Sequence, residues 1–194
     1  LKIFIDLTRL NKPIGFMLLF LPCSWGLAFA YNENQNLYLF LYYLVLFFLG
    51  SVLMRSAGCI FNDIVDKDFD IKVQRTKNRP IASGKINIIQ SLVYVLVLCF
   101  IAFLVLIQFY SLTITLGISS MLLAFAYPFM KRITYWPQLF LGITFNWGII
   151  MACTALNNSL NPEIIILYLA AIFWTLGYDT IYGAQDMSDD EIIG

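Results

Sequence analysis

The longest uncharged stretch of the chain runs from Ile86 to Met130, 45 consecutive positions without Asp, Glu, Lys or Arg. About 20 apolar residues in a helix cross a hydrocarbon core ~30 Å thick, so this stretch is long enough for two crossings. In lipid, a helix satisfies its backbone hydrogen bonds internally. The chain is 60% hydrophobic and only 12% charged, against about 25% charged residues in soluble domains. We therefore expect an all-α, polytopic transmembrane helical bundle.

Charged residues and polar turns divide the chain into six predicted spans. Their approximate boundaries are 13–31, 37–54, 86–107, 112–130, 139–156 and 163–182. None shows the period-two alternation of a half-buried strand, so helices are favoured. This division places all twelve Lys and Arg residues at one end of the bundle and none in the loops at the other end. Because basic loops stay on the cytoplasmic side, the basic end is predicted to face the cytoplasm, or the matrix of a mitochondrion.

The composition excludes several classes of function. The chain has no His, which removes Ser-His-Asp and Cys-His catalysis and every His-ligated metal site. The four cysteines lie far apart inside apolar stretches, so we expect packing residues rather than a disulfide framework; they are Cys23, Cys59, Cys99 and Cys153. Net charge is zero, and the basic residues form no stripe along which a phosphate backbone would lie, so no nucleic-acid partner is expected.

Nine of the twelve acidic residues fall in two windows, 63–70 and 179–191, both at the basic end. With about 100° per helical residue, each window places most of its polar groups on one face, while Asp68 points away. The two faces carry Asn62, Asp63, Asp66 and Asp70, and Asp179, Tyr182, Asp186, Asp189 and Asp190. Carboxylates this dense need a cation, and oxygen ligands without His or Cys suit Mg²⁺. The alternative is a solvated charge cluster without a ligand.

The segment between the windows, Arg75–Lys85, is basic and contains Pro80 and Gly84, which favour a loop. Its cations are expected close to the acidic faces. A site with Mg²⁺-binding acids and guanidinium groups suits a diphosphate, because the metal bridges some oxygens and Arg binds others in bidentate fashion. The alternative is a loop that is basic only to set the topology.

Motifs in chain order resemble those of the UbiA superfamily of intramembrane prenyltransferases. They are Lys12-Pro13-Ile14-Gly15, Asn62-Asp63-x-x-Asp66-x-x-x-Asp70, Arg75-Thr76-x-x-Arg79-Pro80, Tyr127–Gln138, and Asp186-x-x-x-Asp190 preceded by Tyr178–Tyr182. The stretches 127–138 and 178–182 are similar to the 4-hydroxybenzoate polyprenyltransferase branch. Family members have about nine transmembrane helices, so we expect 1–194 to be a single prenyltransferase domain with six of nine spans, lacking its C-terminal helices.

The resemblance implies transfer of a polyprenyl group from polyprenyl diphosphate to 4-hydroxybenzoate, at the ring carbon ortho to the hydroxyl. Diphosphate would be released, in ubiquinone biosynthesis at a bacterial or mitochondrial inner membrane. Mg²⁺ would be held by Asn62, Asp66, Asp70, Asp186 and Asp190, with Asp63 and Asp189 in support. The diphosphate or the acceptor carboxylate would be bound by Arg75, Lys77, Arg79, Lys131 and Arg132. Asp186, assisting loss of the phenolic proton, and Arg132 would be catalytic.

A cation must meet the acceptor carboxylate, because a bare carboxylate at the membrane edge is costly. Outside the Arg75–Lys85 loop the basic-end candidates are Arg9, Lys12, Arg55, Lys131 and Arg132. We favour Arg132 for its aromatic and polar surroundings.

Two other functions stay open. One is a prenyltransferase of the same superfamily with another aromatic or a phosphosugar acceptor. The other is a divalent-cation transporter, which would place carboxylates in the middle of its spans. Here the predicted spans carry almost no ionisable group away from the cytoplasmic end.

Overall fold

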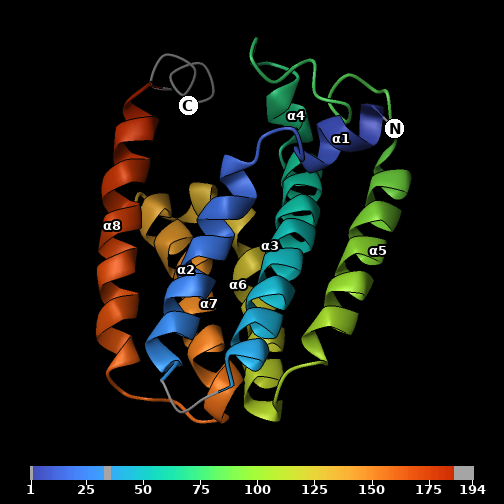
Figure 1. Cartoon of the computed structure of the whole chain (residues 1–194). Helices are drawn as coiled ribbons and strands as arrows, with labels where there is room; N and C mark the ends of the chain where they lie inside the picture. Colours follow the sequence, from blue (N-terminus) through green and yellow to red (C-terminus); the bar gives the residue numbers. More distant parts are fainter. Residues whose placement is uncertain (1, 33–35, 186–194) are drawn as a thin grey trace.

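The computed structural model describes residues 2–32 and 36–185, and every regular element in these ranges is an α-helix. The helices form an elongated bundle (Figure 1), which confirms the predicted all-α fold. They are α1 (Lys2–Thr8), α2 (Ile14–Ala30), α3 (Leu37–Val65), α4 (Lys67–Asp70), α5 (Ile88–Leu106), α6 (Ser111–Ile133), α7 (Pro137–Asn157) and α8 (Ile164–Gln185).

Five of these helices, α3 and α5 to α8, are long and apolar enough to cross a membrane. The sixth predicted span corresponds to α2, an apolar helix of 17 residues. At 1.5 Å per residue α2 is about 26 Å long, slightly shorter than the hydrocarbon core. The protein is therefore an integral membrane bundle with five or six spans, arranged as the uncharged stretches predict.

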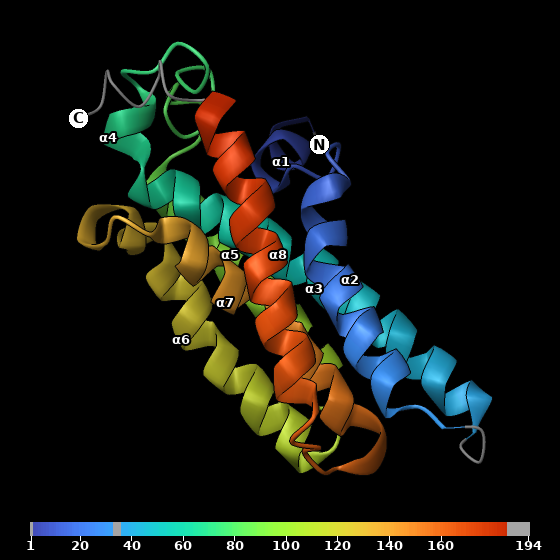
Figure 2. The ribbon, with the colours of Figure 1, turned by 90° about the vertical axis from the view of Figure 1, so that its left-hand side faces the viewer.

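Helix α7 lies at the centre of the bundle, packed against α2, α6 and α8 (Figure 2). In its membrane-crossing window 56% of the residues are buried, against 17–22% in the other four long helices. The approach of α2 to α7 requires a glycine, because a Cβ on Gly26 would stand 2.2 Å from the carbonyl oxygen of Ile149. Helix α3 lies between α2 and α5 and completes the wall on the other side.

Buried polar groups join α7 to its neighbours. Asn146 is 1% exposed, and its Nδ2 donates to Thr175 Oγ1 at 2.8 Å and to the Ala171 carbonyl at 3.2 Å, both on α8. Thr113 and Thr154 join α6 to α7 through hydroxyl groups 2.8 Å apart. Such bonds associate helices where lipid provides no hydrophobic driving force between them.

Helix α3 extends well beyond the predicted end of the second span at residue 54 and continues to Val65. The prediction stopped at Arg55 because it ended each span at the first charge. In the structure the Arg55 side chain lines a cavity among the helices, and the helix continues past it. The helix then breaks at Asp66, and the short α4 follows.

The predicted basic end of the bundle collects α1, α4 and the C-terminal end of α8 (Figure 1). Helix α1 is anchored there by Leu7, which is fully buried in one cluster with Ile60, Ile81 and Ile86. The Arg75–Lys85 segment is a series of turns, with Gly84 at φ 74°. All four cysteines are free thiols, as expected from their spacing.

Candidate active site

A cavity of about 1060 Å³ lies among the helices, bounded mainly by α3, α5, α6 and α7. Its polar end is lined by Arg9, Asn62, Asp66, Asp70, Arg75, Arg79 and Asp179. Its body is lined mainly by apolar and aromatic side chains, among them Leu46, Phe47, Phe103, Phe109 and Met121. Along α3, the distance from Asn62 to Leu46 is about 24 Å at 1.5 Å per residue. The cavity therefore suits an amphiphile with a charged head and a long apolar tail.

The first acidic window places oxygen donors at the head of the cavity. Asn62 and Asp66 are half-buried neighbours one turn apart, and Asn62 Nδ2 donates to Asp66 Oδ2 at 3.1 Å. Asp70, 6% exposed, lines the same end. Carboxylate and amide oxygens are the donors that Mg²⁺ accepts, so the residues present fit this ion.

The predicted helix face groups Asp63 with Asp66. In the structure Asp66 lines the cavity, whereas Asp63 is not among the residues that line it. Its side chain is 1% exposed, and Oδ1 accepts from Arg9 Nη2 and from Arg79 Nη1, the latter at 3.1 Å. A buried carboxylate is stable only when paired in this way. Asp63 thus holds two guanidinium groups behind the head of the cavity.

Arg9 connects α1 to this anchor. It has a left-handed backbone, φ 55°, at the end of α1, an uncommon conformation for a residue with a Cβ. Its side chain binds Asp63 and lines the cavity. No periodicity in the sequence predicts this turn, so the contact between residues 9 and 63 could not be predicted.

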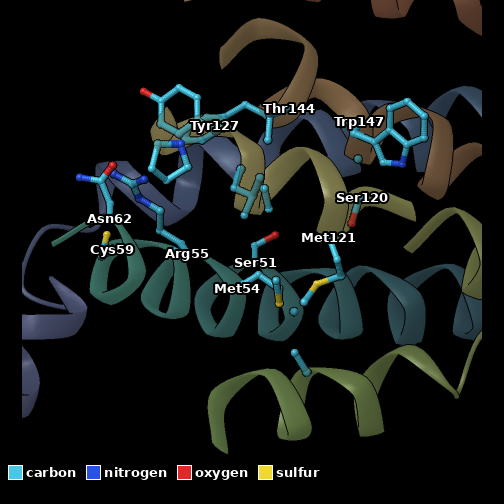
Figure 3. A pocket seen from close by; sticks show the side chains of 18 of the residues that line it. Ser51, Met54, Arg55, Cys59, Asn62, Ser120, Met121, Tyr127, Thr144 and Trp147 are labelled. Carbon is cyan, nitrogen blue, oxygen red and sulfur yellow. The ribbon is translucent and has the colours of Figure 1, made fainter. Parts of the chain in front are cut away.

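Arg55 and Asn62 point from α3 toward Tyr127 on α6 (Figure 3). Tyr127 lines the cavity together with Asp179 of α8, Arg55 and Asp66. The guanidinium carbon of Arg55 lies 5.5 Å from the centroid of the Phe145 ring on α7. Helices α3, α6, α7 and α8 therefore converge on the head of the cavity, and Asp179 brings the start of the second acidic window close to the first.

The other residues of the predicted site differ in whether they line the cavity. Arg75 and Arg79 line the cavity, whereas Lys77 is exposed and is not among the lining residues. The side chains of Lys131 and Arg132, and residues Asp186, Asp189 and Asp190, lie outside the described part of the structure. Among the residues that are described, no three Cys, Asp or Glu side chains gather as a metal-binding group.

Tyr127 and Asp179 line the cavity without having been predicted as site residues. A signal for Asp179 was present, because it shares a helical face with Tyr182 and with the predicted ligand Asp186. Tyr127 begins the motif that continues to Gln138, but nothing in that motif indicates a chemical role for its hydroxyl.

The fold and the cavity define an integral membrane helical bundle with a cavity that suits an amphiphile. The chain belongs to the UbiA prenyltransferase family, whose family model matches residues 19–194. It is 46% identical over 195 residues to the mitochondrial 4-hydroxybenzoate polyprenyltransferase of Rattus norvegicus, covering 100% of this chain and 52% of the relative. The Arabidopsis thaliana protein of the same name is 47% identical, with 97% and 46% coverage. The chain thus spans about half the length of these curated relatives.

Solved structures agree on the fold. A UbiA homolog from Aeropyrum pernix K1 superposes with a TM-score of 0.71 at 26% identity, covering 87% of this chain and 63% of the homolog. A UbiA homolog from Archaeoglobus fulgidus, bound to DMAPP and Mg²⁺, superposes with a TM-score of 0.72 at 16% identity, with 97% and 65% coverage.

Proposed function

We propose that this chain forms the catalytic region of a Mg²⁺-dependent aromatic polyprenyltransferase. It transfers a polyprenyl group from polyprenyl diphosphate to the ring carbon ortho to the hydroxyl of 4-hydroxybenzoate and releases diphosphate, in ubiquinone biosynthesis. The observation that carries the proposal is the cavity, in which oxygen donors and guanidinium groups at the head continue into an apolar body. The names of relatives 46–47% identical to this chain supply the acceptor.

The diphosphate of the donor lies at the polar end of the cavity in this proposal. Mg²⁺ would be held by Asn62, Asp66 and Asp70 together with Asp186 and Asp190, with Asp189 in support. When bound, the ion neutralises charge on the leaving diphosphate. Arg75 and Arg79, in the Arg75–Lys85 loop, bind diphosphate oxygens at the polar end of the cavity. Lys77 adds positive charge from the same loop. The A. fulgidus homolog, bound to DMAPP and Mg²⁺, supports this class of donor.

The acceptor carboxylate is assigned to a cation in the cavity wall. Of the five candidates outside the basic loop, Lys12 is exposed and absent from the lining, and Arg9 is bound to Asp63. Arg55 lines the cavity about 10 Å along α3 from Asn62, over the ring of Phe145. A planar guanidinium binds a carboxylate in bidentate fashion. Arg55 therefore joins Arg132 and Lys131 as an acceptor-binding residue.

The reaction breaks the allylic C–O bond of the donor and forms a C–C bond at the ring. The substituted ring carbon then loses its proton to water or to the released diphosphate, which restores the aromatic ring. The ring is a strong nucleophile only after the phenolic proton is lost, and a carboxylate of the second window, Asp186, accepts that proton. The guanidinium groups at the head of the cavity stabilise the departing diphosphate. Aromatic faces in the body of the cavity stabilise positive charge on the allylic carbon.

The protein works in the inner membrane of a bacterium or a mitochondrion, with the polar end of the cavity facing the cytoplasm or the matrix. The absence of Lys and Arg from the loops at the other end supports this orientation.

The test uses the complete enzyme in membranes, supplied with Mg²⁺, a radiolabelled polyprenyl diphosphate and one acceptor at a time. Label should appear in a prenylated aromatic acid with 4-hydroxybenzoate, and far less with other aromatic acids or with a phosphosugar. If labelled product formed with another acceptor and not with 4-hydroxybenzoate, that acceptor would replace 4-hydroxybenzoate in the proposal. Divalent ions entering sealed vesicles, with no labelled product, would establish the transporter instead.

A further inference from the structure

The guanidinium of Arg55 is held between two helices other than its own. On one side lies Gly15 in the first turn of α2, where a Cβ would stand 2.9 Å from Arg55 Nε, 3.4 Å from Nη2 and 3.6 Å from Cζ. On the other side lies the ring of Phe145 on α7, with its centroid 5.5 Å from Cζ. The guanidinium therefore occupies space that any larger residue at position 15 would take.

Glycine at position 15 leaves room for this contact, and its backbone does not need a glycine, because Gly15 lies in α2 and, unlike Gly84, does not have a positive φ. Gly26, on the same helix, differs, since there the blocking atoms belong to the backbone of Ile149. An alanine at position 15 meets only the end of a flexible side chain. The helix therefore accommodates a methyl group at this position by moving the guanidinium.

A free arginine side chain samples many rotamers, and ordering it on binding costs conformational entropy. A guanidinium that already lies between a glycine and an aromatic ring has fewer rotamers open to it before a ligand arrives. The Phe145 ring, with its centroid 5.5 Å from Cζ, attracts the guanidinium by a cation–π interaction. Gly15 and Phe145 therefore restrict both the position of the Arg55 guanidinium and the number of rotamers it samples.

We propose that Gly15 and Phe145 are positioning residues that orient Arg55 toward the carboxylate of the aromatic acceptor. This inference rests on the proposed function, since it concerns the acceptor of that reaction. It gives the Lys12-Pro13-Ile14-Gly15 motif a role: the motif starts α2 with a residue small enough to let Arg55 reach the cavity. The donor diphosphate, bound at the head by other groups, is not affected.

The experiment measures kcat and the apparent KM for both substrates, together with thermal unfolding, in the complete membrane enzyme. Gly15→Ala should raise KM for 4-hydroxybenzoate about tenfold, as for one weakened charge-assisted hydrogen bond. The donor KM should stay unchanged, and Tm should fall by no more than about 2 °C. Phe145→Leu should act in the same direction, and Phe145→Tyr, which retains the ring, should restore the acceptor KM. Gly177→Ala is the matched control, because no described atom lies within 4 Å of its Cβ position.

A double-mutant cycle tests whether Gly15 acts through Arg55. Lysine lacks the nitrogen and carbon atoms that a Cβ at position 15 would meet, so in an Arg55→Lys background Gly15→Ala should have little further effect. Additive effects, or equal increases in both KM values together with a lower Tm, would overturn the inference and show a general packing role. The inference would also be overturned if the Gly15→Ala variant had the same kcat and KM values as an active wild-type enzyme. A wild-type enzyme that forms no product from 4-hydroxybenzoate would overturn the proposed function itself, and this inference with it.

Discussion

Arg79 binds Asp70 through a single nitrogen, Nη1, which lies 3.0 Å from Oδ1 and 2.8 Å from Oδ2 of that carboxylate. The same nitrogen is 3.1 Å from Asp63 Oδ1. Arg79 therefore connects a carboxylate that lines the cavity to one buried behind it, and the basic loop is held against the end of α3 and against α4.

Replacing Arg79 with lysine keeps the charge but removes the other guanidinium nitrogens, which in the proposed site bind the diphosphate while Nη1 binds the two carboxylates. We expect Arg79→Lys to raise the donor KM and lower kcat, with a combined loss in kcat/KM of about tenfold or more. Lys77→Ala, two residues away at an exposed position outside the lining, should have a smaller effect. Steady-state kinetics with varied polyprenyl diphosphate compares the two. An equal loss in both variants would contradict the different placement of these side chains.

Asp63 and Asp68 give a matched pair for stability. Asp63→Ala leaves the guanidinium groups of Arg9 and Arg79 without their shared partner, and we expect a loss of about 3 kcal/mol in the free energy of unfolding. The loss falls at the lower end of the range for buried pairs because both arginines keep about a quarter of their side-chain surface exposed, 27% and 26%. Asp68 is exposed, so Asp68→Ala should change stability by less than about 0.5 kcal/mol. Denaturant unfolding in detergent micelles measures both, and equal values would disprove the anchoring role.

The two acidic windows, 63–70 and 179–191, allow the proposed metal site to be tested by enzyme activity. Asp66→Ala and Asp190→Ala are each expected to lower kcat more than about 100-fold, because each removes an oxygen donor from the proposed Mg²⁺ site. Asp68→Ala serves again as the control and should remain close to wild type. Raising the Mg²⁺ concentration should rescue part of the Asp66→Ala loss. Wild-type turnover in either of the first two variants would remove that residue from the site.

Arg55 and Arg132 are distinguished by their effect on the acceptor. Arg55→Ala should raise KM for 4-hydroxybenzoate about tenfold or more while the donor KM stays nearly constant. Arg132→Ala should show the same pattern if it shares this carboxylate, and a fall in kcat alone if it stabilises the diphosphate. Unchanged kinetics in Arg132→Ala would show that the Lys131–Arg132 pair only anchors α6 at the membrane surface.

Two glycine-to-alanine substitutions are expected to change the free energy of unfolding differently, because only Gly26 lies at the contact of α2 with α7. Gly26→Ala places a methyl group against the Ile149 carbonyl, so the helices must separate, and we expect about 2–3 kcal/mol of destabilisation. Gly50→Ala on α3 meets no atom within 4 Å, and the better helix former should leave stability unchanged or raise it by up to about 1 kcal/mol. Thermal unfolding of the two variants side by side is the measurement. A neutral Gly26→Ala would refute the tight approach.

Uncharged stretches predicted the helices well because lipid imposes the same demand on every span. The second predicted span ends at residue 54, whereas the helix α3 continues to Val65 and the Arg55 side chain lines the cavity. Sequence order alone does not reveal what a side chain faces. Asp63 shows the other limit. A helical projection places it beside Asn62 and Asp66, but its partner Arg9 lies 54 residues away, in a turn with a left-handed backbone that has no periodic signal. Asp66, Asp179, Arg55 and Tyr127 likewise line one cavity only because α6 packs against α3 and α8 packs against α7.

The central position of α7 has a consequence for biosynthesis. Gly26 and Ile149, which make the closest approach between α2 and α7, are 123 positions apart in the chain, and a ribosome adding about 5–20 residues per second needs roughly 6–25 s to reach the second after the first. During that interval the face of α2 that carries Gly26 lacks the helix that covers it in the folded protein. A nascent chain that stops before α7 therefore presents an unsatisfied helix surface to membrane quality control, whereas one that completes α7 buries this surface in a single docking step.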